Sequence, residues 1–231
     1  MPTYCNADRT MIAKRRATVC LLTGDVRDRF GMDSLDSDAV ALMTKRVYDM
    51  AGSTAGIKVY LNGEKLPIKS FLDYVKLFVQ AQSAPDRAVP LPLLHQKFGK
   101  RWEVAVSLSD GQFSQVSFVN SIATIRGGTH VNHVTDQLTR HLASYVNRTK
   151  KTSLKPFQVK QHIWIFVNCL IENPAFDSQT KCTLTTKAEA FGSSCDLDKR
   201  FLSKVQNCGV VDSIMAWSRY AVHASLWTPP S

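Results

Sequence analysis

The spacing of apolar residues predicts three amphipathic helices, at 35–52, 70–82 and 130–147. In each segment apolar side chains recur at steps of three and four residues, which is the period of a helix with one buried face. Ser34 or Asp36 is a candidate N-cap for the first helix, with Gly52 as its expected stop, and Ser70 is the expected cap of the second. The predicted buried positions are Val40, Met43, Val47 and Met50 in the first helix, and Val131, Val134, Leu138, Leu142 and Val146 in the third.

Runs rich in β-branched and aromatic residues predict strands between and after these helices. The segment "IWIFVNCLI" (163–171) could be a strand or a buried helix, but its length, its composition and the flanking Pro156 and Pro174 favour a strand. Asn62-Gly63 predicts a hairpin, and Asp110-Gly111 is expected to join two antiparallel strands. The expected strands are 17–22, 57–61, 64–68, 93–98, 101–108, 114–122 and 163–171.

Two further helices, 196–206 and 210–222, are expected on either side of Gly209. The order of elements predicts an α/β or α+β fold, with a mixed and mostly antiparallel sheet covered by helices largely on one face. The chain has 231 residues, of which 44% are hydrophobic, so one large or two small domains can form a core. No apolar run reaches the ~18 residues that a membrane span needs.

Charge narrows the choice of partners only slightly. The chain carries 29 basic and 19 acidic residues, a net charge of +10, which attracts polyanions in general. Residues 126–160 hold seven basic residues against one acidic, so +6 of that charge lies in one segment. It could form a patch that faces phosphates or a solvated loop, and composition does not decide between them. The six cysteines are scattered without a CxxC pair, which favours reduced, intracellular thiols over a zinc site or a disulfide framework.

Few short motifs suggest chemistry. His130, His133 and His141 have no recurring metal spacing, so we expect a solvated helix face. In "RGGTH" (126–130) the two glycines favour a tight turn over an anion site. A single lysine in a loop, such as Lys181, is usually exposed to solvent and binds no ligand. However, Lys181 follows a buried strand and has Gln179 and Thr180 beside it, and a loop held by a strand can direct a charge at a terminal phosphate.

Four longer segments together resemble the eukaryotic type IIA DNA topoisomerases, over roughly residues 21–221. They are "KVYLNGEKLPIKSFLDYV" (58–75), "SFVNSIATIRGGTHVNHVTDQL" (117–138), "QVKQHIWIFVNCLIENPAFDSQTK" (158–181) and "FGSSC" (191–195). The resemblance implies a ribosomal-protein-like transducer domain at 67–223, preceded at 19–66 by the C-terminal strand and helix of a GHKL ATPase domain. Residues 1–18 and 224–231 are tails that match no part of the family.

The resemblance also implies a mechanism and partners. Gln179, Thr180 and Lys181 would contact the γ-phosphate of ATP, which the family uses with Mg²⁺. A cluster of Arg148, Lys150 and Lys151 would face double-stranded DNA, and the family works as a nuclear homodimer with no membrane association. Two departures are Cys182, where relatives have Glu, and a basic loop with Asn147 and Thr149 at positions where some relatives have lysines.

The motifs of the ATP pocket and the DNA-cleaving tyrosine are not in this sequence, so the resemblance implies no catalytic or metal-binding residue. We therefore expect a fragment of an ATP-dependent type II topoisomerase that neither hydrolyses ATP nor cleaves DNA by itself. The alternative is a stand-alone, non-catalytic basic module, an inactive truncated paralogue that binds DNA or a partner. A third possibility is aggregation, because the apolar face of the ATPase-domain remnant would lack its sheet.

Overall fold

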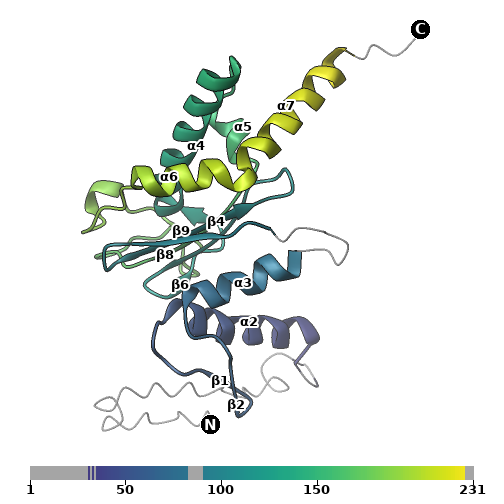
Figure 1. Ribbon diagram of the computed structural model, residues 1–231. Helices are drawn as coiled ribbons and strands as arrows, with labels where there is room; N and C mark the ends of the chain where they lie inside the picture. The colour runs from purple at the N-terminus through teal and green to yellow at the C-terminus, as the bar shows by residue number, and fades with distance from the viewer. Residues whose placement is uncertain (1–30, 32, 34, 83–90, 227–231) are drawn as a thin grey trace. The chain divides into compact units, whose positions relative to one another are not determined.

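The computed structural model describes residues 31, 33, 35–82 and 91–226, with the backbone alone for 219–226 (Figure 1). The chain divides into two compact units, residues 1–74 and 75–231. The strand expected at 17–22 and both tails, apart from the end of the last helix, lie outside the described residues. The domain bounds expected at 66 and 223 remain predictions.

The first unit contains α2 (Ser37–Ser53), a hairpin of β1 (Tyr60–Leu61) and β2 (Glu64–Lys65), and the start of α3 (Phe71–Gln82). Asp36 caps α2, since its carboxylate accepts a hydrogen bond of 2.6 Å from the Ala39 N–H. Asn62 and Gly63 form the predicted turn with φ of 51° and 86°. Ser70 caps α3 as predicted, because its Oγ accepts a hydrogen bond of 3.2 Å from the Asp73 N–H.

Two predictions for α2 are wrong. Gly52 does not stop the helix, which continues to Ser53 and has Thr54 as its C-cap. A side chain at Gly52 would overlap the Tyr74 ring, so glycine is there to allow close packing. The predicted apolar face is not buried either: Val40 is 48% exposed and Met50 39%. The buried end of α2 holds Asp49 instead, whose carboxylate accepts a hydrogen bond of 2.6 Å from the Tyr74 hydroxyl.

The second unit is built on a five-stranded sheet in the order β3-β4-β8-β5-β6. Its strands are β3 (Leu94–Phe98), β4 (Trp102–Leu108), β5 (Ser114–Val119), β6 (Ile122–Ala123) and β8 (Ile163–Cys169). The strand prediction for 163–171 is confirmed, and β8 lies at the centre. The pairing expected across Asp110-Gly111 is wrong, because β8 separates β4 from β5. It runs antiparallel to β4 and parallel to β5.

Helices cover both faces of this sheet (Figure 1). On one face, α4 (Thr129–Lys150) buries all five predicted positions, each at most 2% exposed. The short α5 (Pro156–Lys160) follows it, and α6 (Lys199–Val205) and α7 (Val211–Leu226) complete this layer, separated at Gly209 as predicted. On the opposite face, Phe78 of α3 packs edge-on against Trp164 and Phe166 of β8. The expected mixed, mostly antiparallel sheet with helices is confirmed.

Candidate functional site

The loop 178–182 is closed at its base like a narrow hairpin. Phe176 lies opposite Leu184 in an antiparallel bridge, and the Asp177 N–H donates to the Thr183 carbonyl at 3.1 Å. One step farther out, the Thr185 N–H donates to the Ala175 carbonyl at 2.9 Å. These bonds fix both ends of the loop, so its five residues project from an ordered base.

Short hydrogen bonds also order the interior of this loop. The Asp177 carboxylate accepts from the Thr183 N–H at 3.2 Å and from the Ser178 hydroxyl at 3.0 Å. Hydrogen bonds from Thr183, together with that from Ser178, hold the pKa of the Asp177 carboxyl below its usual range. The Lys181 N–H donates to the Ser178 carbonyl at 3.1 Å, and Lys181 has a φ of 56°, in the left-handed region. The backbone therefore turns sharply at the predicted contact residue.

The three residues predicted to meet a phosphate are consecutive and exposed at the tip of the loop. Gln179 offers an amide N–H₂, Thr180 a hydroxyl and Lys181 an ammonium group, all of which can donate to phosphate oxygens. Among the described residues Lys181 has no carboxylate partner; its Nζ lies over the Phe176 ring, 5.8 Å from the centroid. The loop thus groups three donors and one uncompensated positive charge.

Phe176 and Cys182 contact the side chains of two of these donors. Our prediction from the sequence gave neither residue a structural role. The Phe176 ring extends under the Lys181 ammonium, where a cation–π contact favours the side chain's position. The Cys182 thiol lies 3.2 Å from the Thr180 hydroxyl. The contact between Phe176 and Lys181 had one signal in the sequence, an aromatic residue five positions before a loop lysine.

A second set of bonds fastens this loop to the start of α4. The strand β7 (Gly127–Gly128) pairs in parallel with β9 (Thr183–Leu184), and the Arg126 N–H donates to the Cys182 carbonyl at 3.0 Å. The Thr129 hydroxyl adds a bond of 2.6 Å to the Thr186 carbonyl. We call these contacts of residues 126–129 with 182–186 the latch. The turn predicted for the "RGGTH" segment is confirmed only at Arg126, because Gly127 and Gly128 form β7 and α4 begins at Thr129. The two glycines allow close backbone contact with β9.

Gly128 shows why the latch needs glycine. Its φ of 133° and ψ of −161° suit a residue without a side chain. A Cβ at this position would overlap the Leu184 backbone, which cannot move aside as a flexible side chain could. A larger residue would therefore force β7 and β9 apart.

The expectation of a solvated histidine face on α4 is wrong. His130 is fully buried, and its Nε2 lies 3.1 Å from the Thr124 hydroxyl. Burial lowers the pKa of His130 to about 3, so the ring is neutral at pH 7. His130 precedes Val134 by four residues and Leu138 by eight. This helical spacing already placed it on the apolar face, and we missed that signal.

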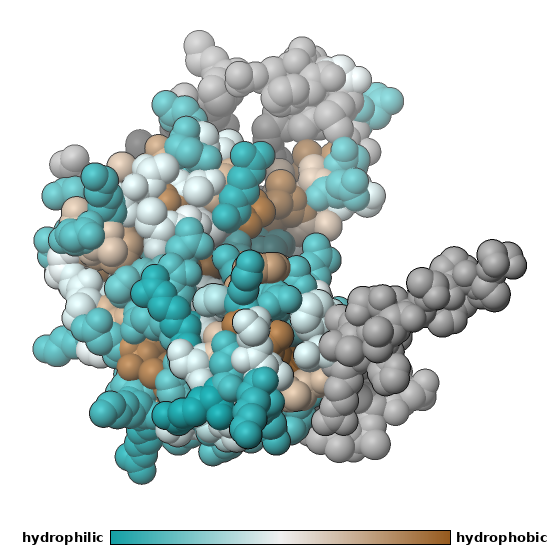
Figure 2. All heavy atoms as spheres, turned by 90° about the horizontal axis from the view of Figure 1, so that it is seen from above, coloured by the Kyte–Doolittle hydropathy of each residue, from teal (hydrophilic) through white to brown (hydrophobic). Residues whose placement is uncertain are grey.

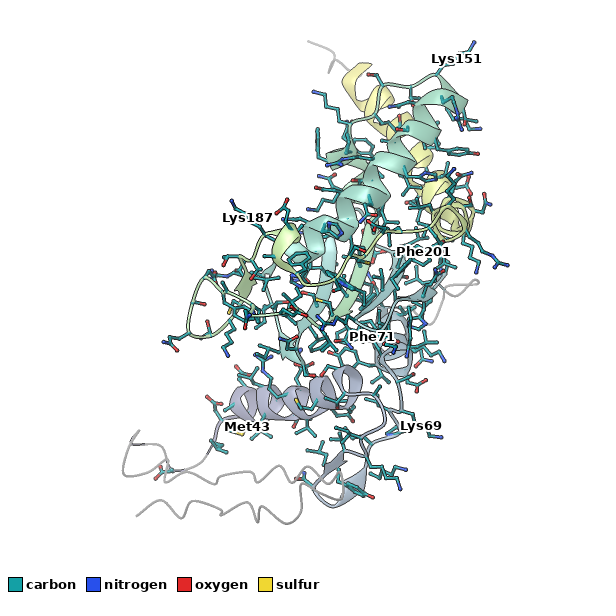
Figure 3. All side chains as sticks on the ribbon, turned by 90° about the vertical axis from the view of Figure 1, so that its left-hand side faces the viewer. Met43, Lys69, Phe71, Lys151, Lys187 and Phe201 are labelled. Atoms are coloured by element: carbon teal, nitrogen blue, oxygen red, sulfur yellow. The ribbon has the colours of Figure 1, made fainter. Side chains whose placement is uncertain are left out.

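The basic cluster predicted to face DNA lies at the other end of α4. Arg148 and Lys150 are in the last helical turn, and Lys151 is the C-cap with a φ of 53°. All three are exposed, and Figure 3 shows Lys151 at the tip of the helix, far from Lys187, which follows the latch. Figure 2 shows hydrophilic side chains over most of the described surface seen from above, with apolar atoms in separate small areas. Because Arg126 belongs to the latch, the basic segment 126–160 is not one patch.

The part of the chain that the structure describes shows no sign of a metal site or a membrane span. It contains no group of three or more His, Cys, Asp and Glu side chains arranged to hold a metal ion. None of its helices is long and apolar enough to cross a membrane. Its four cysteines are free thiols, and burial raises the pKa of Cys169 and Cys195.

Comparison with known proteins identifies the family. The protein-family model described as DNA gyrase B matches residues 68–226, more than half of the chain. The DNA topoisomerase 2 of Arabidopsis thaliana is 52% identical over 200 residues, which are 86% of this chain and 14% of that protein. This chain belongs to the DNA gyrase B and DNA topoisomerase II family. Human DNA topoisomerase 2-beta is 48% identical over 86% of the chain, and the chain spans 12% of its length.

Solved topoisomerase II structures share the fold. The ATPase region of Saccharomyces cerevisiae topoisomerase II aligns with a TM-score of 0.72 and 44% identity, over 82% of this chain and 47% of that one. The ATPase and transducer domains of the Balamuthia mandrillaris enzyme align with a TM-score of 0.73 and 41% identity, over 83% and 47%. The chain thus corresponds to part of the ATPase and transducer region of type II topoisomerases, and it covers about half of those solved chains.

Proposed function

We propose that this chain is the transducer region of an ATP-dependent type II DNA topoisomerase and that Lys181 senses the γ-phosphate of ATP. Membership of the family supports the general role, and the latch supports the specific one. The exposed donors at 179–181 are bonded through the latch to the first turn of α4. A force on the loop is therefore transmitted to a long helix.

The donor set fits a terminal phosphate. Lys181 would supply a point charge, while Gln179 and Thr180 would supply directed hydrogen bonds. ATP would contribute a phosphoryl group whose transfer a positive charge stabilises. We assign no Mg²⁺ ligand to the described residues, which contain no suitable cluster of carboxylates. The residues that complete the nucleotide pocket and hold Mg²⁺ would lie in the rest of the enzyme.

The helix α4 is the proposed relay. Its 22 residues span about 33 Å, with the latch at one end and Arg148, Lys150 and Lys151 at the other. Its inner face is locked into the core by side chains that are at most 2% exposed. A shift of the loop on loss of the γ-phosphate would therefore move α4 as a body or break the latch. In the family setting this relay acts in a nuclear homodimer on double-stranded DNA.

The test replaces the matching region of the A. thaliana enzyme with residues 68–226 of this chain. We expect the chimaera to relax supercoiled DNA with ATP, because the exchanged parts are about half identical. Lys181→Ala should lower the ATP turnover number about 100-fold, the usual effect of removing one group that stabilises transition-state charge. Lys181→Arg should retain more activity than Lys181→Ala because it keeps the charge.

Lys187→Ala is the matched control, because Lys187 is an exposed lysine six residues farther along the same segment. It should leave turnover unchanged. Equal activity of the Lys181→Ala and Lys187→Ala chimaeras would contradict the sensing role. The isolated 231-residue chain should show no ATP turnover, and turnover stimulated by DNA would contradict the proposal that it lacks a complete site.

A second function is supported by the exposed cluster at the tip of α4. Arg148, Lys150 and Lys151 have no carboxylate partner among the described residues, so their charges are free to meet phosphates. In this alternative the chain is a stand-alone, non-catalytic module that binds DNA or an acidic partner. DNA binding that is independent of ATP distinguishes it from the relay.

A further inference from the structure

A small pocket lies between the first half of α4 and the segment that follows the latch. It has a volume of about 330 Å³ and is lined by His133, by Ala188 and Glu189 of η2 (Ala188–Ala190), and by residues 191–194. This volume is at the lower end for ligand sites, so it suits one side chain or a small ion rather than a nucleotide. Lys181 and the basic cluster are not among the lining residues.

The walls of this pocket are held in place by packing and hydrogen bonds. The Trp102 indole N–H donates to the Ser193 hydroxyl at 2.9 Å. The Phe191 ring lies 5.6 Å from that of Trp102 and 6.0 Å from that of His133, measured between centroids. A Cβ at Gly192 would overlap the end of the Glu172 side chain, so that side chain lies directly against the loop. The pocket is therefore formed before any ligand arrives, which lowers the entropic cost of binding.

Besides Glu189, the polar side chains that line the pocket are His133, Ser193 and Ser194. His133 Nε2 donates to the Cys195 carbonyl at 3.2 Å, so this ring nitrogen already has a partner within the protein. The Ser193 hydroxyl also has lone pairs beyond the one that accepts from Trp102. A ligand that is rich in donors can bond to this hydroxyl and to the carboxylate of the same pocket.

Glu189 gives the pocket a negative charge. Its carboxylate is exposed and has no ion-pair partner in the described part of the chain. The nearby Glu172 differs, because Arg101 lies 2.6 Å from its Oε1 and neutralises it. In Figure 3 the neighbouring Lys187 side chain extends away from the body of the protein. An uncompensated carboxylate on a chain of net charge +10 marks a local site for a cation.

We propose that this pocket binds the guanidinium group of an arginine side chain from a partner polypeptide. A guanidinium carries five N–H donors in a plane and a full positive charge, so it can satisfy the Glu189 carboxylate and the neighbouring acceptors together. A lysine ammonium is a single point with three donors and cannot reach acceptors on several sides of the pocket equally well. The site does not depend on the nucleotide role of the loop 178–182.

The test uses Trp102 as a built-in reporter. The chain has four tryptophans, and the indole N–H of Trp102 bonds directly to a lining residue. The ¹⁵N-labelled full chain is titrated with N-acetyl-arginine methylamide, with the neutral isostere N-acetyl-citrulline methylamide and with N-acetyl-lysine methylamide. We expect the arginine probe to shift the Trp102 indole signal, assigned with Trp102→Phe, along with the amides of 189–194. The citrulline probe should give no shift, and the lysine probe should bind several-fold more weakly.

Two variants complete the test. Glu189→Gln should weaken binding of the arginine probe about tenfold or more, because it removes the charge from the hydrogen bond. Glu64→Gln is the control, since Glu64 is an exposed glutamate on β2 and should leave the affinity unchanged. Equal shifts with citrulline, or unchanged affinity in Glu189→Gln, would overturn the proposal. Equal affinity for the lysine probe would also overturn it, by showing a general cation site.

Discussion

At the scale of single residues, His130 makes stability depend on pH. Its pKa is lowered by burial to about 3, whereas in the unfolded chain it is about 6.5. Below pH 6.5 the unfolded chain therefore binds a proton that the folded chain excludes, and folding loses free energy as the pH falls. We expect the unfolding free energy to drop by about 1.4 kcal/mol per pH unit between pH 6 and 4 from this residue alone. Urea titrations followed by circular dichroism measure that slope.

The control for this prediction is His130→Phe, which keeps a ring in the cavity but cannot titrate. The variant is expected to be less stable at pH 7, because Thr124 loses a hydrogen-bond partner. Its stability should nevertheless fall less steeply with acid than that of the parent chain. Burial also lowers the pKa of His162, but that contribution is common to both proteins and cancels in the comparison. Identical slopes for the two proteins would contradict the prediction.

Gly52 and Lys181 show which features of single residues can be predicted from the sequence and which cannot. Gly52 resembled a helix stop, because glycine is common just after helices, yet a distant tyrosine fills the space above it. That contact joins residues 22 positions apart and leaves no local pattern. Lys181 could be singled out from its place after a buried strand. The contacts that position it involve Phe176 and the latch, which only the folded chain brings together.

At the scale of elements, the latch between β7 and β9 sets the position of the loop. We expect Gly128→Ala to destabilise the protein by about 3 kcal/mol, since it combines backbone strain with overlap of the Leu184 backbone. The Arg126 amide, which donates to Cys182, should then exchange its hydrogen much faster in native-state hydrogen exchange. The experiment reports on the latch directly, separately from any nucleotide chemistry.

Gly127→Ala is the matched control for the latch. Gly127 also has a positive φ, of 76°, but a Cβ there would meet only ordinary contacts of 3.4 Å or more. It should therefore cost about 1 kcal/mol from strain alone. Equal losses of stability in the two variants, with equal exchange at Arg126, would show that close packing of Gly128 on β9 is unimportant.

The order of the strands was the main error at this scale, and its cause is physical. The turn residues Asp110-Gly111 indicate where the chain reverses, but they do not say which strand becomes the neighbour. The segments 114–122, 130–147 and 163–171 form a strand–helix–strand sequence, which favours a parallel pair of strands joined by a crossover helix. Had this rule been given more weight than the turn signal, it would have placed β8 beside β5. The types of most described elements are local properties and were predicted correctly. The hairpin strands expected at 57–61 and 64–68 are shorter than predicted, because β1 and β2 have two residues each.

At the scale of the whole molecule, the distribution of charge matters more than its total. The net charge of +10 predicts a general attraction to polyanions. The structure divides the most basic segment between the latch, which holds Arg126, and the tip of α4, which holds Arg148, Lys150 and Lys151. Within that segment, the tip presents three exposed cations close together in sequence. Specific contact with DNA should therefore depend on the tip, while the remaining charge contributes a weaker, uniform attraction.

This division predicts how DNA binding depends on salt. Each phosphate contact contributes a slope of about −0.9 in a plot of log affinity against log salt concentration, so three contacts give about −2.7. Replacing Arg148, Lys150 and Lys151 with Gln should make the slope less negative by up to that amount and weaken binding to a duplex at low salt. The control replaces three exposed lysines of the first unit, Lys58, Lys65 and Lys69, and removes the same total charge. Fluorescence anisotropy with a labelled duplex measures all three proteins. Equal slopes for the two triple variants would show that DNA affinity depends on net charge alone. The proposed DNA contact at the tip of α4 would then be wrong.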